Sequence, residues 1–207
     1  MKSSIWNFWA NKYDRLWVQK YSLTPTRNCI VNAVSESHDS NDSIKVLDLG
    51  CGPGELIKDL TDKFASLDIT GIDFSEKMLE ISMSRNPHAR HIKIDASDLY
   101  ELKDKFDVII CTHSLPYYKE PKKVMKELSR LLNDDGRLFM GFASGNDFYD
   151  KFILGFVKLT TGPAYYPSHE DFKQLTRNYF QIEDLKIIRE KLYMPRIAIY
   201  TLKKAMS

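Results

Sequence analysis

The stretch that decides the fold of this chain is Ile44-Lys45-Val46-Leu47-Asp48-Leu49-Gly50-Cys51-Gly52-Pro53-Gly54-Glu55-Leu56. A short apolar run rich in branched residues leads into three alternating glycines, after which apolar residues recur at a helical spacing. This pattern is typical of a strand, a tight turn and a helix. A glycine is needed in such a turn where φ is positive or where the backbone lies directly against a bound molecule. The sequence therefore predicts the start of a βαβ unit whose turn contacts a ligand.

The spacing of the glycines argues against two common phosphate-binding turns. A dinucleotide-binding turn reads Gly-x-Gly-x-x-Gly, but Glu55 stands where its third glycine would be, and its carboxylate would meet the pyrophosphate. A Walker-type loop is excluded because no Gly-Lys-Ser/Thr follows. Asp73 ends the next apolar run, about 20 residues downstream, where an acidic side chain can accept hydrogen bonds from both ribose hydroxyls. Together these features predict a site for a nucleoside without a phosphate chain.

Several motifs in order resemble the class I S-adenosylmethionine-dependent methyltransferases. Asp48-Leu49-Gly50-Cys51-Gly52-Pro53-Gly54 and Gly71-Ile72-Asp73-Phe74-Ser75 resemble motif I and the acidic residue after it. Further similarities lie at Asp95-Ala96, 106–111, 128–132 and 136–139, so the resemblance covers about half of the chain. It implies a Rossmann-like doubly wound α/β sheet, mostly parallel with an antiparallel C-terminal strand pair, and S-adenosyl-L-methionine as the cofactor.

The resemblance also implies which residues bind the cofactor, most of them at the carboxyl ends of predicted strands, where ligands bind in such sheets. They are Asp48, Gly50, Gly52, Gly54, Asp73, Phe74, Asp95, Ala96 and Cys111. We expect Asp73 to bind the ribose. Phe74 either covers one face of adenine or packs in the core, and Asp95 either accepts a hydrogen bond from the adenine amino group or caps a helical turn. Asp48 is expected to orient the glycine backbone or a water near the substrate amine.

Composition limits the possible classes of protein. A chain of 207 residues with 43% hydrophobic content suits one α/β domain. The net charge of +2 gives no general attraction to nucleic acid or to a membrane surface. The three cysteines show no spacing typical of zinc ligands or disulfides, so we expect no metal and a reducing compartment. Without a leader or a run of eighteen apolar residues, the sequence predicts a cytoplasmic protein, either a monomer or a homodimer.

Residues 1–43 precede the first strand and hold all three tryptophans. Aromatic residues recur at helical spacing over 5–20, so one face of a helix there is aromatic, and it either packs on the core or covers the cofactor. In the resembling family, a pattern like Trp9-Ala10-Asn11-Lys12-Tyr13-Asp14 often brings a tyrosine to the methionine carboxylate. We therefore expect an N-terminal helical lid, with Tyr13 at the cofactor and Trp9 at the substrate.

Strands and helices alternate over the predicted cofactor-binding core, residues 44–143, which argues for a parallel sheet covered by helices on both faces. The expected strands are 44–49, 67–73, 90–94, 106–111 and 137–142, and the expected helices are 55–65, 76–85 and 121–132, with a helical turn at 97–101 and a turn at 133–136. Before the core, Thr24 is expected to cap a helix that ends near Val34. The C-terminal part, 168–207, predicts a helix to about Tyr179 and two antiparallel strands, 180–191 and 193–202.

The stretch after the fourth strand, Thr112-His113-Ser114-Leu115-Pro116-Tyr117-Tyr118, lies where the family positions groups near the transferable methyl. It has neither the Asn/Asp-Pro-Pro-Tyr/Phe of amine methylation in DNA nor the Pro-Cys of cytosine C5 methylation, so DNA is disfavoured as a partner. His113 is the candidate catalytic base, since its pKa is ordinarily near neutrality. A lone histidine on a loop is also often a plain hydrogen-bonding residue.

Residues 144–167 form a predicted substrate-side insert rich in aromatic residues, which is either a lid or a core helix. The expected substrate-binding residues are Trp9, Tyr117, Tyr165, Tyr166 and His169. The sequence thus predicts a methyltransferase that acts on a small, partly apolar or aromatic molecule, without membrane insertion. Two alternatives stay open: a protein or RNA methyltransferase with a shallow site, and a scaffold subunit that binds the cofactor without turnover.

Overall fold

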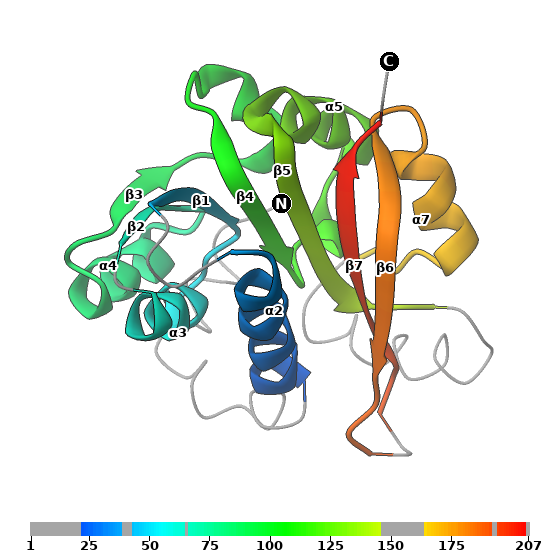
Figure 1. Ribbon diagram of the computed structural model, residues 1–207, viewed down its shortest axis with the longest axis horizontal. Helices are drawn as coiled ribbons and strands as arrows, with labels where there is room; N and C mark the ends of the chain where they lie inside the picture. The colour runs from blue at the N-terminus through cyan, green and yellow to red at the C-terminus, as the bar shows by residue number, and fades with distance from the viewer. Residues whose placement is uncertain (1–21, 39–42, 65, 146–163, 192–193, 206–207) are drawn as a thin grey trace.

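One seven-stranded sheet organises the chain in the computed structural model, which describes residues 22–38, 43–64, 66–145, 164–191 and 194–205 (Figure 1). The strands are β1 (Ile44–Leu49), β2 (Leu67–Asp73), β3 (Arg90–Lys93), β4 (Phe106–Thr112), β5 (Leu132–Ala143), β6 (Phe180–Ile188) and β7 (Ile197–Lys204). Their order is β3-β2-β1-β4-β5-β7-β6. The pairs from β3 to β5 are parallel, and β5-β7 and β7-β6 are antiparallel. The predicted mostly parallel sheet with an antiparallel C-terminal pair is confirmed.

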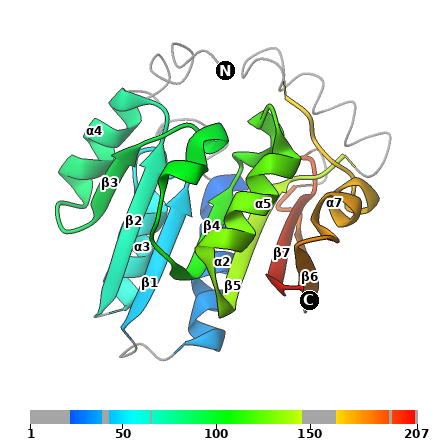
Figure 2. The same ribbon diagram turned by 90° about the horizontal axis from the view of Figure 1, so that it is seen from above.

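Helices cover both faces of the sheet. They are α2 (Thr24–Ser37), α3 (Glu55–Lys63), α4 (Glu76–Arg85), α5 (Pro121–Leu131) and α7 (His169–Thr176), with the 3-10 turns η3 (Ala96–Glu101) and η4 (Leu115–Tyr117). Figure 2 shows α5 and α7 in front of the sheet and α2 and α3 behind it. Each face has its own cluster of buried hydrophobic side chains, because the central strands are apolar on both sides.

Local side-chain chemistry explains where some of these helices begin. Ser75 caps α4 as predicted, since its Oγ accepts a hydrogen bond from the Met78 backbone N–H at 3.3 Å. Ser168 and Asp171 form a capping box at the start of α7. The prediction that Thr24 caps α2 is wrong: Leu23 holds the N-cap position, and the Thr24 hydroxyl instead accepts a hydrogen bond from the Arg27 guanidinium. The helix also continues to Ser37, beyond the expected end.

The prediction of a turn at 133–136 before the fifth strand is wrong, because β5 begins at Leu132 and these residues form a bulge inside it. Phe106 pairs with Leu132 and Val108 with Arg137, so the residues between them on β5 leave the ladder. Asp107 holds the bulge in place, because its Oδ1 accepts from Asn133 Nδ2 at 2.6 Å and its Oδ2 accepts from the Lys45 backbone N–H at 2.9 Å. At the C-terminus, β6 ends before the predicted boundary, and β7 begins and ends later than predicted.

The order of the strands fixes where a ligand can bind. The first strand lies between β2, which follows it in the chain, and β4, which lies on its other side. The connections after β1 and β4 therefore run in opposite directions, and the carboxyl ends of these two strands flank a switch point. Both the glycine turn after β1 and the loop after β4 lie at this edge. The predicted lid helix over 5–20 lies outside the described residues.

Candidate functional site

The three glycines of the turn all have left-handed backbones, with φ of 79° at Gly50, 52° at Gly52 and 77° at Gly54. A Cβ on Gly50 would lie 2.8 Å from Ser114 Cβ, and one on Gly54 would collide with Ser82 and Asn86. A Cβ on Gly52 would meet nothing within 4 Å. Two of the glycines thus make room for neighbouring protein, whereas Gly52 is bare backbone next to open space, as a ligand-binding turn requires.

Asp73 joins the glycine turn to the end of β2. Its Oδ2 accepts from the Gly52 backbone N–H at 3.0 Å, and its Oδ1 accepts from the Ser75 backbone N–H at 2.8 Å. The side chain is buried, and burial raises its pKa while these backbone donors oppose the rise. Each carboxylate oxygen has a second acceptor position. Asp73 can therefore accept further hydrogen bonds from a ligand while it holds the turn.

Asp48, the last but one residue of β1, is a buried carboxylate that has no partner among the described residues. It is 1% exposed, and neither Oδ1 nor Oδ2 accepts a hydrogen bond. Burial, and secondly the nearby Asp73 carboxylate, raise its pKa to about 7. Buried polar groups are nearly always paired, so an unpaired carboxylate indicates a missing donor or cation. Asp48 makes no hydrogen bond to the glycine turn, so of its two predicted roles the one that remains is to orient a water near the substrate amine.

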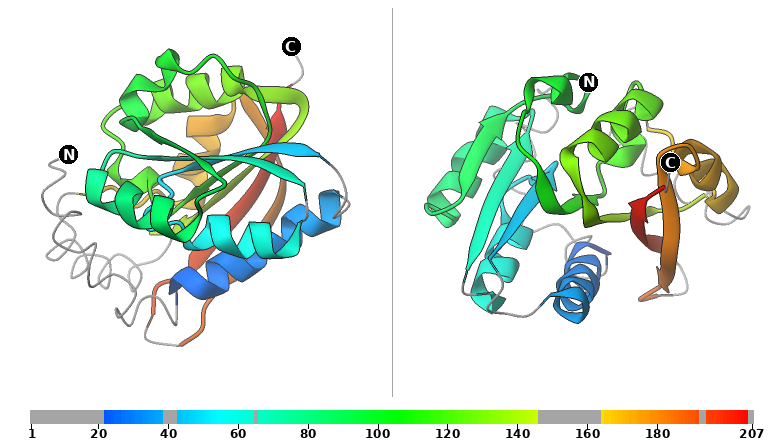
Figure 3. Two further views of the ribbon diagram at one scale, coloured as in Figure 1. Left: turned by 90° about the vertical axis from the view of Figure 1, so that its left-hand side faces the viewer. Right: turned by 45° about the horizontal axis from the view of Figure 1, so that its top comes forward.

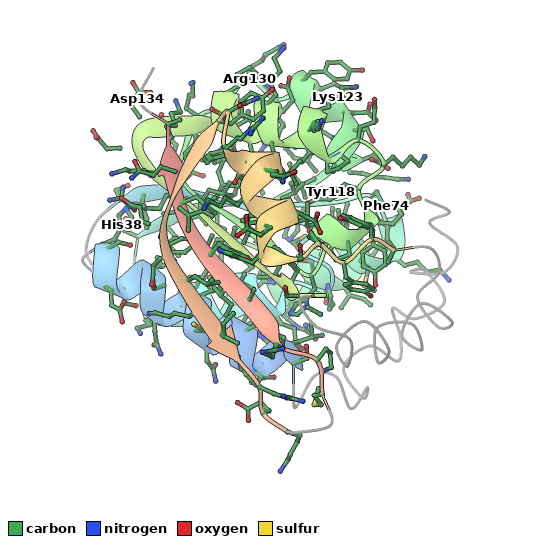
Figure 4. All side chains as sticks on the ribbon, turned by 90° about the vertical axis from the view of Figure 1, so that its right-hand side faces the viewer. His38, Phe74, Tyr118, Lys123, Arg130 and Asp134 are labelled. Carbon is green, nitrogen blue, oxygen red and sulfur yellow. The ribbon has the colours of Figure 1, made fainter. Side chains whose placement is uncertain are left out.

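A buried cluster of hydroxyl and thiol groups fixes the loop after β4 against the turn. Ser114 Oγ donates to the Leu49 carbonyl at 3.2 Å and therefore accepts from Tyr118 OH, 2.9 Å away. The Cys111 thiol lies 3.1 Å from both hydroxyls, and burial raises its pKa, so it stays protonated. The contact of Cys111 with the cofactor stays a prediction. The sequence prediction did not name Ser114 or Tyr118 as site residues, although both belong to the stretch that it placed near the reacting methyl. Tyr118 is labelled in Figure 4, as is Phe74, which follows β2.

His113 has an unusual backbone for a residue with a side chain, with a φ of 56°. Its backbone N–H donates to the Gly141 carbonyl at 2.6 Å, and its Nε2 lies 3.1 Å from Thr26 Oγ1 on α2. Burial, and secondly the positive charge of Arg27, lower the pKa of His113 to about 4. The imidazole is therefore neutral at physiological pH. Its contact with Thr26 connects the loop after β4 to the start of α2.

Glu55, the first residue of α3, is held between two arginines. Arg27 Nη2 lies 2.9 Å from Glu55 Oε2, and Arg85 Nη1 lies 3.2 Å from Oε1. Arg27 also reaches Asp59 Oδ2 at 2.7 Å, which ties α2 to α3, the two helices that lie side by side in Figure 3. The Glu55 charge is thus largely balanced, so the argument against a pyrophosphate rests on the glycine spacing more than on this carboxylate.

Asp95, Ala96 and Phe74 lie next to the ends of β2 and β3. Asp95 Oδ1 accepts from the Ser97 backbone N–H at 3.0 Å and from Ser97 Oγ at 2.7 Å, so it caps η3, the second of its two expected roles. Although burial opposes it, these hydrogen bonds lower the pKa of Asp95. Ala96 begins η3, and Phe74 is half-buried directly after Asp73. Their contact with adenine stays a prediction.

Three of the predicted substrate-binding tyrosines gather at η4. The Tyr165 backbone N–H donates to the Pro116 carbonyl at 2.8 Å, and Tyr166 OH lies 3.4 Å from Tyr117 OH. Tyr165 is 61% exposed. The end of the predicted insert therefore lies across the loop after β4. His169 is the first residue of α7, and its ring stacks on Tyr200 with the centroids 5.8 Å apart. Trp9, Tyr13 and the rest of the insert, 146–163, lie outside the described residues.

Comparison with known proteins agrees with this geometry. The family model of the methyltransferase domain matches residues 47–140. A demethylmenaquinone methyltransferase of Thermotoga maritima is 34% identical over 131 residues, covering 62% of this chain and 56% of that protein. A malonyl-[acyl-carrier protein] O-methyltransferase of Bacillus anthracis is 29% identical over 111 residues, covering 53% of this chain and 41% of that protein. The chain thus matches about half the length of these relatives.

A solved structure extends the comparison to most of the chain. Magnesium protoporphyrin IX methyltransferase from Synechocystis PCC 6803, with bound SAH, superposes with a TM-score of 0.70 at 21% identity. The superposition covers 87% of this chain and 83% of that one, and at this identity it supports the fold. Residues 47–140 of this chain therefore match the family of methyltransferase domains, and the strand order and the glycine turn with Asp73 agree with that match.

Proposed function

We propose that this chain binds S-adenosylmethionine at the glycine turn and transfers its methyl group to a small, partly apolar or aromatic molecule. The observation that carries the proposal is Asp48, a fully buried carboxylate whose two oxygens have no partner in the described part of the chain. Such a group is satisfied by a water, an ion or a ligand, and we infer a ligand here because the glycine turn lies beside it. The methionine part of the cofactor has an amino group that can do so.

The neighbouring residues fit the rest of the cofactor. Gly52 leaves open space over its backbone, and Asp73 keeps acceptor positions for the two ribose hydroxyls. Asp95, Ala96 and Phe74 are proposed to line the adenine side, and Tyr13 the carboxylate. When bound, the cofactor supplies a methyl group activated by a positively charged sulfonium. The task left to the chain is to exclude water and to align the acceptor, so most of the rate should come from positioning.

His113 is the proposed proton acceptor. With a pKa of about 4 it is neutral, so it can accept a hydrogen bond from an acceptor hydroxyl or ammonium. The low pKa also makes it a weak base, which suits an acceptor whose proton leaves late in the reaction. His169, whose Nδ1 lies 3.3 Å from Tyr200 OH, is the second candidate, since it lies on α7 and not on the loop after β4.

The substrate class rests on the tyrosines at η4 and on the names of the similar proteins. Tyr117, Tyr165 and Tyr166 present aromatic rings with hydroxyl groups, a surface that suits an apolar molecule with a few polar atoms. The three similar proteins are named for demethylmenaquinone, for a malonyl group on an acyl carrier protein and for magnesium protoporphyrin IX. A substrate with an apolar or aromatic part is consistent with all three.

Two alternatives make different predictions. An RNA methyltransferase needs clustered Lys and Arg for phosphate contacts, whereas the net charge of this chain is +2. A protein methyltransferase or a scaffold subunit would co-purify with a protein partner, which size-exclusion chromatography can detect. No helix among the described residues is long and apolar enough to cross a bilayer. A cytoplasmic location, which the cysteine pattern favours, is part of the proposal.

Calorimetric titration with S-adenosylmethionine and its demethylated product tests the cofactor site. We expect Asp73→Ala to weaken binding by about 1 to 3 kcal/mol, because hydrogen bonds to a charged group are lost. Asp68→Ala is the matched control, since this carboxylate lies on the same strand but is exposed at its other end, 4.0 Å from Lys45. Equal affinities in the two variants would contradict the ribose assignment. A screen of apolar and aromatic acceptors with labelled cofactor then tests the substrate class.

A further inference from the structure

The side chains around His113 decide which of its ring nitrogens carries the proton. Thr26 Oγ1 donates its single hydrogen to the Ser22 carbonyl at 2.8 Å. Toward His113 Nε2, 3.1 Å away, the same oxygen can therefore only accept. It follows that Nε2 carries the hydrogen, and because the imidazole is neutral, Nδ1 holds the free lone pair.

Thr26 can take this position only because Gly141 has no side chain. Thr26 is fully buried, and a Cβ on Gly141 would lie 2.9 Å from Thr26 Cγ2. The Gly141 carbonyl also accepts the His113 backbone N–H at 2.6 Å and so helps hold the left-handed backbone of His113. One short stretch of β5 thus fixes the histidine backbone and admits the threonine that binds its ring.

We propose that Thr26 is a positioning residue for methyl transfer: it fixes His113 as the Nε2–H tautomer, so that Nδ1 is the atom that accepts the acceptor's proton. The inference rests on the proposed function for the role of Nδ1, whereas the hydrogen on Nε2 follows from the hydrogen bonds of Thr26 alone. The charged group that faces the ring from α2 is Arg27, whose positive charge favours the neutral imidazole. Thr26 and Arg27 therefore act on the same ring from successive positions of one helix.

Nitrogen NMR of the ring tests the tautomer without any substrate. Long-range proton–nitrogen correlation spectra distinguish a protonated from an unprotonated ring nitrogen, and His113 is assigned by comparison with His113→Asn. We expect the Nε2–H form in the unmodified protein and in Thr26→Ser, which keeps the hydroxyl. In Thr26→Val, and in Gly141→Ala, where the new Cβ displaces Thr26, we expect a mixture of tautomers. An Nδ1–H form in the unmodified protein would overturn the inference.

Kinetics with an acceptor found in the screen tests the positioning role. Thr26→Val should lower kcat by about tenfold or more, since acid–base catalysis typically contributes two to four orders of magnitude and depends on the correct tautomer. KM for the cofactor should stay the same, and Thr26→Ser should restore kcat. The matched control is Thr176→Val on α7, another buried threonine whose Oγ1 donates to the carbonyl four residues earlier, at 3.0 Å.

The outcomes separate this inference from the proposed function. A change of tautomer in Thr26→Val with unchanged kcat would overturn the positioning role while the methyltransferase proposal stands. Equal losses of kcat in Thr26→Val and Thr176→Val would mean a general effect on folding and would also overturn it. If the cofactor does not bind to the unmodified protein, the proposed function fails, and with it the role of Nδ1.

Discussion

The ionisation of Asp48 should make the free energy of unfolding of the protein depend on pH. Its pKa is about 7 in the folded, ligand-free chain and about 4 in an unfolded chain. Between these values the folded state binds a proton that the unfolded state has lost, so the free energy of unfolding falls as pH rises from about 4 to about 7. We expect this single group to lower stability by about 2 to 4 kcal/mol over that interval. Urea unfolding of cofactor-free protein at several pH values measures the effect.

The control for this prediction is Asp48→Asn, which keeps the shape of the side chain and removes its ionisation. As pH rises from 5 to 8, the free energy of unfolding of the unmodified protein should fall relative to that of the variant. Parallel pH profiles for the two proteins would mean that Asp48 is not protonated in the folded state. The cause named here, burial beside Asp73 without a partner, would then be wrong.

The three glycines of the turn should respond differently to alanine. Gly52→Ala has room for its Cβ, so we expect a stability loss of only about 1 to 2 kcal/mol from the left-handed backbone, but a large loss of cofactor affinity, about tenfold or more. Gly54→Ala adds a collision with Ser82 and Asn86, and we expect a stability loss of about 2 to 5 kcal/mol. Urea unfolding and calorimetric titration of both variants check this. Equal stability losses would contradict it.

At the scale of residues, the sequence alone predicts some members of the site, whereas other contacts are found only in the structure. The glycines and Asp73 are readable because a positive φ restricts the residue type and because the strand end fixes where an acidic side chain lies. The contacts of Ser114 with Gly50, and of Thr26 with His113, join segments that are far apart in the chain. No local pattern marks such contacts, so the tautomer of His113 could not be inferred without the structure.

At the scale of elements, α2 is joined to α3 by a partly buried ion pair network, and its loss should be measurable. The Arg27 side chain is 14% exposed and contacts both Glu55 and Asp59. Arg27→Met removes the cation and leaves two carboxylates behind, so we expect the free energy of unfolding to fall by about 1 to 3 kcal/mol. The control is Lys58→Met, which breaks the exposed Lys58–Asp62 pair within α3 and should change stability by about 0.5 kcal/mol or less. A similar small effect of both substitutions would show that the network contributes little.

The predicted and observed bounds show where the spacing of apolar residues is enough to place a helix or strand and where it is not. The central strands and α4 match their predicted bounds closely, because continuous apolar runs and a serine cap define them. At 133–136, the turn residues suggested a break between helix and strand, yet Asp107 holds them as a bulge that belongs to β5. Thr24 looked like a cap, but its hydroxyl binds Arg27. In the first case a side chain from a neighbouring strand changed the local structure, and in the second a side chain three residues along the same helix did so.

At the scale of the whole molecule, the parallel sheet with its covering helices follows from the alternation of elements, whereas the substrate does not. Parallel strands joined by helices place every strand end from β1 to β5 on one edge, so a prediction of the fold is also a prediction of where the site lies. In the proposed substrate site, the walls come from the loop after β4 and from the segment at 164–167, which meets that loop through the hydrogen bond of Tyr165 to Pro116. Such loops vary without changing the fold, and this is why the acceptor has to be found by experiment.

The identity of the cofactor can be tested on the whole chain by thermal unfolding. A ligand that binds only the folded state at 100 times its Kd adds about 2.7 kcal/mol of stability, which raises Tm by about 5 to 10 °C in a chain of this size. We expect this shift with the demethylated product of S-adenosylmethionine and none with NAD or ATP, because the glycine spacing does not suit a phosphate chain. If Asp73→Ala weakens binding tenfold, the same ligand concentration should give about half the shift, since the added stability falls to about 1.4 kcal/mol. A shift with NAD or ATP, and none with the demethylated product, would mean that the turn binds a different cofactor.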